Sequence, residues 1–165
     1  MILILVKSIH HGNTQKVAEV FAKVLDAQIK TPEQVNIEEF QQYSLIGFGS
    51  GIYGGKHHTS LLKLADNLPQ VKNHKAFIFS TDGAPRALIK YDLSFEKEKL
   101  SHNHDLLREK LKSKGYTIVG EFLCGGFNTN NVLKLFGGIN KGRPNAEDLK
   151  HAEVFAENLK LNKKN

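Results

Sequence analysis

Two hydrophobic patterns alternate along the chain. Short runs of apolar, often β-branched residues are typical of buried strands, and we expect five: Ile2 to Val6, Ala27 to Lys30, Leu45 to Gly49, Ala76 to Ser80 and Thr117 to Cys124. Between these runs, apolar residues recur every three or four positions, which is the spacing of one helix face. Strands that are apolar on both sides must be covered on both sides. The patterns therefore predict a doubly wound α/β fold with a parallel sheet.

Four helices are expected from this spacing. The first carries its apolar face at Val17, Val20, Phe21, Val24 and Leu25. The second begins with Thr59 as its N-cap and ends before Pro69. The third is marked by Leu107 and Leu111, and the last follows Pro144.

The order of the strands predicts where a ligand would bind. For five strands with right-handed crossovers the commonest order is 2-1-3-4-5, in which ligands bind at the carboxyl ends of the strands. Long loops leave three of these ends, over residues 49–58, 81–102 and 125–145, whereas only 31–42 is long at the opposite edge. Long loops gathered at one edge indicate a functional site.

The first strand runs into the loop Ser8 to Thr14, with sequence SIHHGNT. A helix that starts after a buried strand presents unpaired N–H groups and the positive end of its dipole, which attract an anion. Ser8 and Thr14 add hydroxyl groups, Asn13 adds an amide, and Gly12 allows close backbone approach. This chemistry suits a phosphate. The alternative is that Asn13 or Thr14 is an ordinary N-cap beside exposed histidines.

Two further loops suit a flat ring. The glycine-rich stretch Gly49 to Gly55 carries Ile52 and Tyr53, and the stretch from Ser80 offers polar side chains with little bulk. Together with a phosphate loop they describe a site for a mononucleotide with a large planar base. Residues 49–54 also read GxGxxG, with Asp82 after the next strand, so a dinucleotide fingerprint is a competing interpretation. That motif normally opens a helix directly, whereas the helix here is expected only at Thr59.

Metal and nucleophile chemistry have weaker support. His57 and His58 form a second histidine pair, and a four-histidine metal site with His10 and His11 is conceivable. These four histidines have neither HxH nor HxxxH spacing and no paired carboxylates beside them in the sequence, so we expect no metal site. It also lacks a GxSxG elbow and a GxxxxGK[ST] loop, and Cys124 is expected in the core. No side chain is assigned as acid, base or nucleophile.

Composition limits the remaining classes. The chain has 165 residues, enough for one domain over 1–160 with a basic tail at 161–165. Its net charge is +6, but the lysines are scattered and no aromatic residues are interleaved with them, so we expect no nucleic-acid binding. No apolar run approaches the roughly 20 residues that span a bilayer, so no stable membrane insertion is expected. A single cysteine fits a soluble, cytoplasmic protein.

The phosphate loop resembles that of the flavodoxin family, which follows the pattern (S/T)xTGNT and is matched by Gly12, Asn13 and Thr14. The resemblance covers almost the whole chain and implies a flavodoxin-like fold with bound FMN. Its phosphate would lie at the first loop and its ring between the second and third loops. The residues expected to contact FMN are Ser8, His10, His11, Gly12, Asn13, Thr14, Ser50, Gly51, Ile52, Tyr53, Gly54, Gly55, Ser80, Thr81, Asp82 and Gly83.

Some features depart from electron-carrier flavodoxins, which are usually strongly acidic and place a Trp and a Tyr on the two faces of the ring. This chain is basic and has no Trp. Its second loop, and a long loop after the fifth strand with an apolar patch, resemble menaquinone-dependent protoporphyrinogen dehydrogenase. The patch comprises Val132, Leu133, Leu135, Phe136 and Ile139, and is either a satellite core or a platform for a substrate, a partner or a membrane quinone.

We therefore expect an FMN-binding electron carrier that exchanges electrons with redox partner proteins, a quinone or another small acceptor. The alternative is an FMN-dependent oxidoreductase acting on a quinone or porphyrinogen, with His57, His58 and the late apolar loop near the flavin. A third possibility is a flavodoxin-like binding module without flavin.

Overall fold

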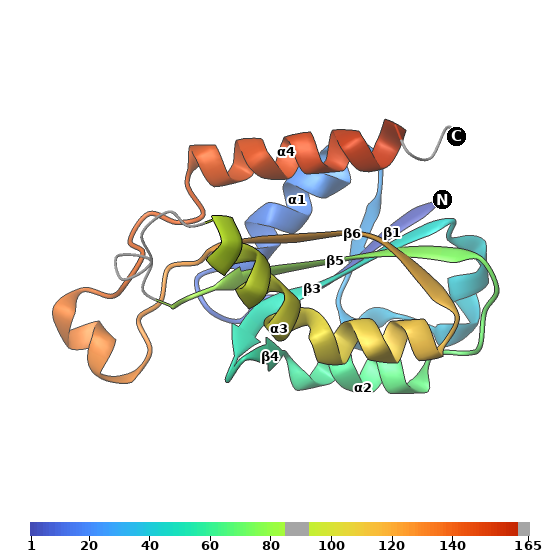
Figure 1. Cartoon of the computed structure of the whole chain (residues 1–165), viewed down its shortest axis with the longest axis horizontal. Coiled ribbons are helices and arrows are strands. Elements are labelled where there is room, and N and C mark those ends of the chain that lie inside the picture. The colour runs from blue at the N-terminus through green and yellow to red at the C-terminus, as the bar shows by residue number, and fades with distance from the viewer. Residues whose placement is uncertain (85–92, 162–165) are drawn as a thin grey trace.

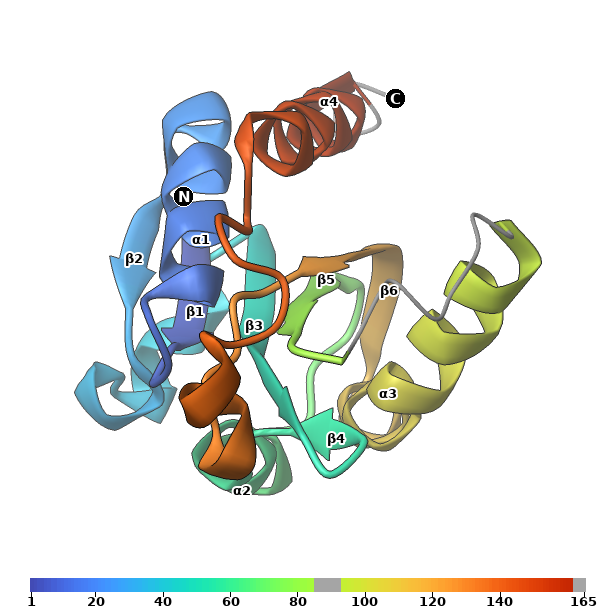
Figure 2. The same ribbon diagram turned by 90° about the vertical axis from the view of Figure 1, so that its left-hand side faces the viewer.

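A sheet of six strands forms the centre of the molecule, and helices cover both of its faces (Figures 1 and 2). The computed structural model describes residues 1–84 and 93–161. The strands are β1 (Ile2–Lys7), β2 (Gln28–Lys30), β3 (Leu45–Tyr53), β4 (Lys56–His57), β5 (His74–Asp82) and β6 (Tyr116–Gly125). The helices are α1 (Asn13–Leu25), α2 (Thr59–Asn67), α3 (Leu93–Ser113) and α4 (Ala146–Leu161), with short 3-10 helices η1 (Pro32–Gln34), η2 (Ile37–Gln42) and η4 (Asn131–Phe136).

Five strands are parallel and lie in the order β2-β1-β3-β5-β6. This is the predicted order 2-1-3-4-5, and the predicted doubly wound α/β fold is confirmed. The sixth strand, β4, pairs antiparallel with the end of β3 and was not expected. It brings the second loop back along the carboxyl end of the sheet.

Two hydrophobic cores lie on the two faces, because alternate residues of the buried strands point to opposite sides. Leu3 and Leu5 pack with α2 and α3, whereas Ile2 and Ile4 pack with α1 and α4. The same alternation continues to the strand ends, where it places Ser50 on the α2 and α3 side. The fold thus positions polar residues at the site as strictly as it positions the core.

Several expected boundaries were wrong. Helix α3 begins at Leu93, so the third loop is shorter than the predicted 81–102; residues 85–92 lie outside the described ranges. The N-cap of α2 is His58 rather than Thr59, because the His58 side chain accepts the N–H of Ser60. The expected loop 31–42 contains η1 and η2. Within residues 1–84 and 93–161, no helix is long and apolar enough to cross a membrane.

Candidate functional site

A cavity opens at the carboxyl edge of the sheet, where the expected loops meet. Its volume is about 230 Å³, below the range typical of pockets that enclose a whole ligand. A larger ligand would therefore leave part of its surface exposed. The lining residues are Ser8, Ile9, His10, Asn13, Thr14, Gly51, Ile52, Tyr53, Thr81, Asp82, Gly83, Ala84, Phe127, Asn128, Asn130, Leu133 and Ile139.

Ten of the sixteen predicted contact residues line this cavity, from all three predicted loops: Ser8, His10, Asn13, Thr14, Gly51, Ile52, Tyr53, Thr81, Asp82 and Gly83. The other six lie nearby but not in its wall: His11, Gly12, Ser50, Gly54, Gly55 and Ser80. Ser50 and Ser80 are fully buried beneath the loops. Contact between any of these residues and FMN stays a prediction.

The first loop makes a sharp turn into α1. His11 and Gly12 both adopt left-handed backbone conformations, with φ of 54° and 65°. Gly12 is the N-cap, so the interpretation of Asn13 or Thr14 as the cap is wrong; both belong to the first turn of α1. Consecutive backbone N–H groups in such a turn form a concave site for an anion, and the dipole of a 13-residue helix adds to it.

Asn13 and Thr14 tie this turn to its neighbours. The Asn13 Nδ2 donates to the Phe127 carbonyl at 2.8 Å, while its Oδ1 is buried without a partner in the described part of the chain. The Thr14 and Thr81 hydroxyl oxygens lie 2.8 Å apart, which joins the first loop to the end of β5. The buried Oδ1 is a polar atom that a ligand donor can satisfy.

The second loop is a β-hairpin. Ile52 pairs with His57 and Tyr53 with Lys56. Gly54 and Gly55 form the two-residue turn with φ of 58° and 78°, a conformation that favours glycine. The hairpin presents Gly51, Ile52 and Tyr53 to the cavity.

Tyr53 lines the cavity and contacts two histidine rings. Its ring centroid is 5.8 Å from that of His10 and 5.5 Å from that of His58, the latter edge-on. Burial raises the pKa of the Tyr53 phenol, opposed by its hydrogen bond with the backbone of Ile9. A Cβ on Gly51 would lie 2.9 Å from the Tyr53 oxygen, so glycine is required for this placement.

The third loop presents backbone groups and one carboxylate, that of Asp82. The Asp82 carboxylate accepts the Ala84 N–H at 2.8 Å and the Asn103 Nδ2 at 3.0 Å. These bonds fix the turn that follows β5 and leave Gly83 facing the cavity.

The long loop after β6, which the sequence predicted at this edge of the sheet, forms a fourth wall, although none of its residues was among the sixteen predicted contacts. It folds back through the paired residues Asn128 and Ile139, and Asn140 donates to the carbonyls of Ala84 and Gly126. Phe127, Asn128, Asn130, Leu133 and Ile139 thereby line the cavity. The signal that could have found them is the run of asparagines, which hydrogen-bond the backbone in turns.

The apolar patch of this loop divides into two parts. Leu133 and Ile139 face the cavity, whereas Val132, Leu135 and Phe136 are exposed, the last two by 82% and 81%. Helix η4 projects beyond the sheet edge (Figure 1). The satellite-core interpretation therefore does not describe its outer half.

The competing motifs have other roles here. Gly49 is a packing glycine, because a Cβ there would lie 2.2 Å from the Phe79 ring, and residues 49–54 lead into a hairpin rather than a helix. The described residues contain no group of three His, Cys, Asp or Glu side chains that could hold a metal. Cys124 is buried in the core.

Comparisons with known proteins match this architecture. A model of the flavodoxin domain matches residues 3–119. An uncharacterised protein of Methanocaldococcus jannaschii, MJ0298, is 49% identical over 160 residues, covering 97% of this chain and 98% of that protein.

Solved flavodoxins share the fold. Oxidised flavodoxin 2 of Bacillus cereus superposes with a TM-score of 0.64 at 21% identity, covering 94% of both chains. A Fusobacterium nucleatum flavodoxin, solved with flavin mononucleotide bound, has a TM-score of 0.64 at 10% identity and covers 98% of both chains. The domain model matches well over half of the chain, which shows that the chain belongs to the flavodoxin family.

Proposed function

We propose that this protein binds FMN and carries electrons between redox partners. The observation that carries the proposal is the convergence of the three predicted loops on one cavity, with a helix start on one side and apolar side chains on the other. The family match and the FMN-bound relative support it. When bound, FMN would supply the redox chemistry, and the protein would supply position and electrostatics.

The residues of the cavity fit the two parts of this cofactor. The turn at His11 and Gly12, with Ser8 and the start of α1, offers hydroxyl and backbone donors to a phosphate. Ile52, Tyr53, Leu133 and Ile139 offer apolar contact to a planar ring. The buried Asn13 Oδ1 remains available for a donor of the ligand.

A fluorescence titration of the flavin-free protein with FMN and with riboflavin tests this assignment. We expect FMN to bind at least tenfold more tightly, because only FMN carries a phosphate for the α1 turn. Equal affinities would contradict the phosphate loop. No binding of either flavin would favour the module without flavin.

The partner surface is the exposed part of the long loop. Val132, Leu135 and Phe136 form an apolar group on the outside of the cavity wall. Residues 126–145 contain three basic and no acidic residues, and the whole chain has a charge of +6. We infer that the electron partner presents an acidic surface with an apolar centre.

The second candidate is an FMN-dependent oxidoreductase acting on a quinone or porphyrinogen. The apolar wall at Leu133 and Ile139 favours it, because such a wall would accept a flat apolar substrate. An anaerobic redox titration separates the candidates. Two resolved one-electron steps support the carrier, and a single two-electron step with NAD(P)H-driven quinone reduction supports the enzyme.

A further inference from the structure

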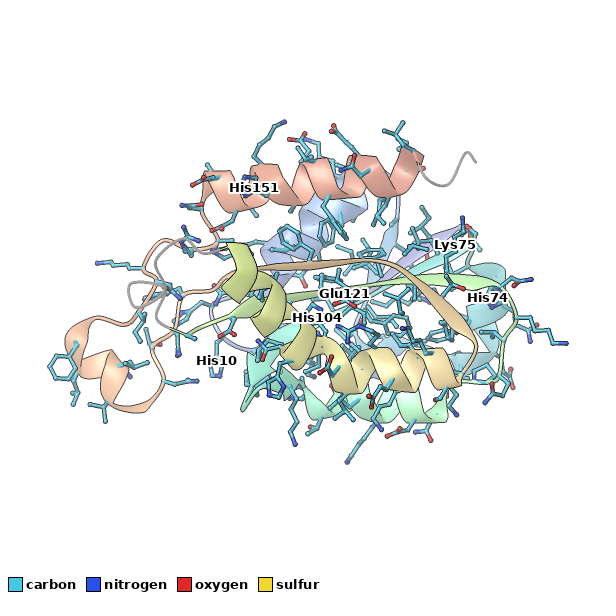
Figure 3. All side chains as sticks on the ribbon, viewed as in Figure 1. His10, His74, Lys75, His104, Glu121 and His151 are labelled. Carbon is cyan, nitrogen blue, oxygen red and sulfur yellow. The ribbon has the colours of Figure 1, made fainter. Side chains whose placement is uncertain are left out.

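A largely buried polar cluster lies beneath the second and third loops, outside the cavity itself. It consists of Ser50 on β3, His57 on β4, Ser80 on β5, His104 and Arg108 on α3, and Glu121 on β6. His104 and Glu121 are seen side by side between α3 and the sheet in Figure 3. The cluster joins the hairpin, the end of β5 and α3, so it connects the two ring loops through groups that do not line the cavity.

Ser50 is the central residue of the part of the cluster that lies in the hairpin. Its Oγ lies 2.9 Å from His57 Nδ1, 2.9 Å from the His58 N–H nitrogen and 2.8 Å from the Gly51 carbonyl oxygen. A hydroxyl has one proton and two lone pairs. All three contacts are satisfied when Ser50 donates to Gly51 and accepts from His58 and from the Nδ1–H of His57. This arrangement makes His57 Nε2 a bare acceptor.

Glu121 organises the other half. Its carboxylate accepts Arg108 Nη2 at 2.9 Å, a second Arg108 bond through Nε, and His104 Nδ1 at 3.0 Å. Burial would raise the pKa of Glu121, but the bonds from Arg108 and His104 outweigh it and hold that pKa at about 2. The anion holds a proton on His104 Nδ1, and the Ser80 hydroxyl oxygen lies 2.8 Å from His104 Nε2 on the other side of the ring.

The two halves meet at the imidazole rings. The ring centroids of His57 and His104 are 4.9 Å apart, and the side chains are 1% and 0% exposed. His57 Nε2 has no hydrogen-bond partner among residues 1–84 and 93–161. Burial, and then the neighbouring His104, hold the pKa of His57 well below its ordinary value, while Glu121 acts in the opposite direction.

A proton on His57 would therefore be costly in this arrangement. Its Nε2–H would be buried without an acceptor, and a charged ring would lie against His104. Among the described residues, the charges that act on His57 are those of His104 from α3 and Glu121 from β6. Arg108 of α3 is bound to Glu121, and Asp82 of β5 is turned toward Asn103. Opening of the hairpin would release the ring to water and allow protonation.

We propose that His57 and His104 are positioning residues of the site, which hold the hairpin and the end of β5 against α3 through Ser50 and Ser80, and that the hairpin stays closed only while His57 is neutral. That the site binds a flavin rests on the proposed function, whereas the closed state of the hairpin can be measured without any ligand. Acid would thus weaken flavin binding through a residue that does not line the cavity.

The test measures hydrogen-exchange protection factors of amides 51–58 in the flavin-free protein at pH 7.5 and 5.5. In the open hairpin His57 would have an ordinary pKa near 6.5, and in the closed hairpin it stays neutral. The wild type should therefore lose protection about tenfold when the pH falls from 7.5 to 5.5. His57→Asn keeps an amide N–H near the position of Nδ1 but cannot titrate. It should keep its protection factors unchanged between the two pH values.

His151→Asn is the matched control, because His151 is exposed on α4, away from the cluster (Figure 3). It should behave like the wild type. Ser50→Ala removes the central hydroxyl with little change in volume, and should lower hairpin protection about tenfold already at pH 7.5. Undiminished protection in the wild type at pH 5.5, or the same loss in His57→Asn, would overturn the proposal.

Riboflavin titrations of the same proteins connect the hairpin to the ligand. Riboflavin is used because it lacks the phosphate, which titrates itself. Its dissociation constant should rise between pH 7.5 and 5.5 in the wild type, by up to about tenfold, and stay constant in His57→Asn. A wild type that binds no flavin would refute the proposed function and leave the exchange result standing, whereas a pH-independent constant would refute the proposed coupling.

Discussion

His10 and His11 follow β1, and His57 and His58 follow β3, so the chain places two histidine pairs at the same edge of the sheet. The first pair lies in an open turn: His10 lines the cavity, and His11 is exposed, with its Nε2 2.7 Å from the Thr129 hydroxyl. In the second pair His57 is buried against His104, and His58 caps α2. Identical dipeptides thus lie at the cavity in one loop and hold the framework in the other.

The difference comes from the backbone on which each pair stands. In the first loop the chain turns outward into α1 through left-handed residues. In the second it returns as β4, and antiparallel pairing sends alternate side chains to opposite faces, so that His57 enters the interior. The same residue type therefore gains a role from its strand position rather than from its neighbour in sequence.

The largest expected effect is a difference in protein stability between a variant of the second histidine pair and a variant of the first. His57→Ala removes a buried ring and its bond to Ser50, and should lower the free energy of unfolding by about 2 to 4 kcal/mol. His10→Ala should change it by less than about 0.5 kcal/mol, because the ring is partly exposed. Urea unfolding followed by circular dichroism measures both. Equal losses would break the comparison.

The next effect tests the ligand role of the first loop. Asn13→Asp places a negative charge at the start of α1, where it suits the helix dipole but would repel a phosphate. We expect FMN affinity to fall at least tenfold more than riboflavin affinity. Asn67→Asp, on the exposed end of α2, is the control and should leave both affinities unchanged. An equal loss for the two flavins would remove the phosphate from this turn.

A smaller effect concerns pH and global stability. His57 has a lowered pKa in the fold, so the unfolded chain takes up protons first as pH falls below about 6.5, and stability decreases. Between pH 7.5 and 5.5 this linkage amounts to about 1.4 kcal/mol in the wild type relative to His57→Asn. Glu121 has a pKa of about 2, so the stability that it adds is present at both pH values and is lost only as the pH falls below its ordinary pKa of about 4.5. Urea unfolding at several pH values measures this loss. If His57 is not its source, the wild type and His57→Asn would lose stability equally between pH 7.5 and 5.5.

The smallest effect is expected at the exposed histidine. His11→Asn loses the Thr129 contact and the contact with the Phe127 ring, whose centroid is 4.5 Å away. We expect less than about 0.5 kcal/mol in stability and at most a twofold change in FMN affinity. A loss above about fivefold for FMN but not for riboflavin would show that His11 holds the phosphate directly.

Much of the fold was accessible from local patterns. Every predicted strand and helix exists, because buried strands and one-faced helices have distinct periodicities. The extension of β3 to Tyr53 was missed, since Gly49 and Gly51 indicate a loop when the aromatic rings that occupy their space are not known. The early start of α3 was missed because residues 93–101, LSFEKEKLS, show little apolar periodicity.

The site was predicted in part for the same reason. Its three loops follow strand ends, so their meeting follows from the strand order. The fourth wall, with Phe127, Leu133 and Ile139, depends on hydrogen bonds from Asn128 and Asn140 to residues more than ten positions away. The cluster around His57 and Glu121 likewise joins residues 64 positions apart, which no local pattern connects.

The sequence by itself determined the elements, their order in the sheet and the edge at which a ligand would bind, because these depend on periodicity and on chain connectivity. Only the tertiary structure decided which histidine is buried, which glycine makes room for an aromatic ring and which loop closes the cavity. These outcomes depend on distances between segments that are remote in the chain. Burial and hydrogen-bond partners, rather than residue type, therefore set the separate roles of His10 and His57.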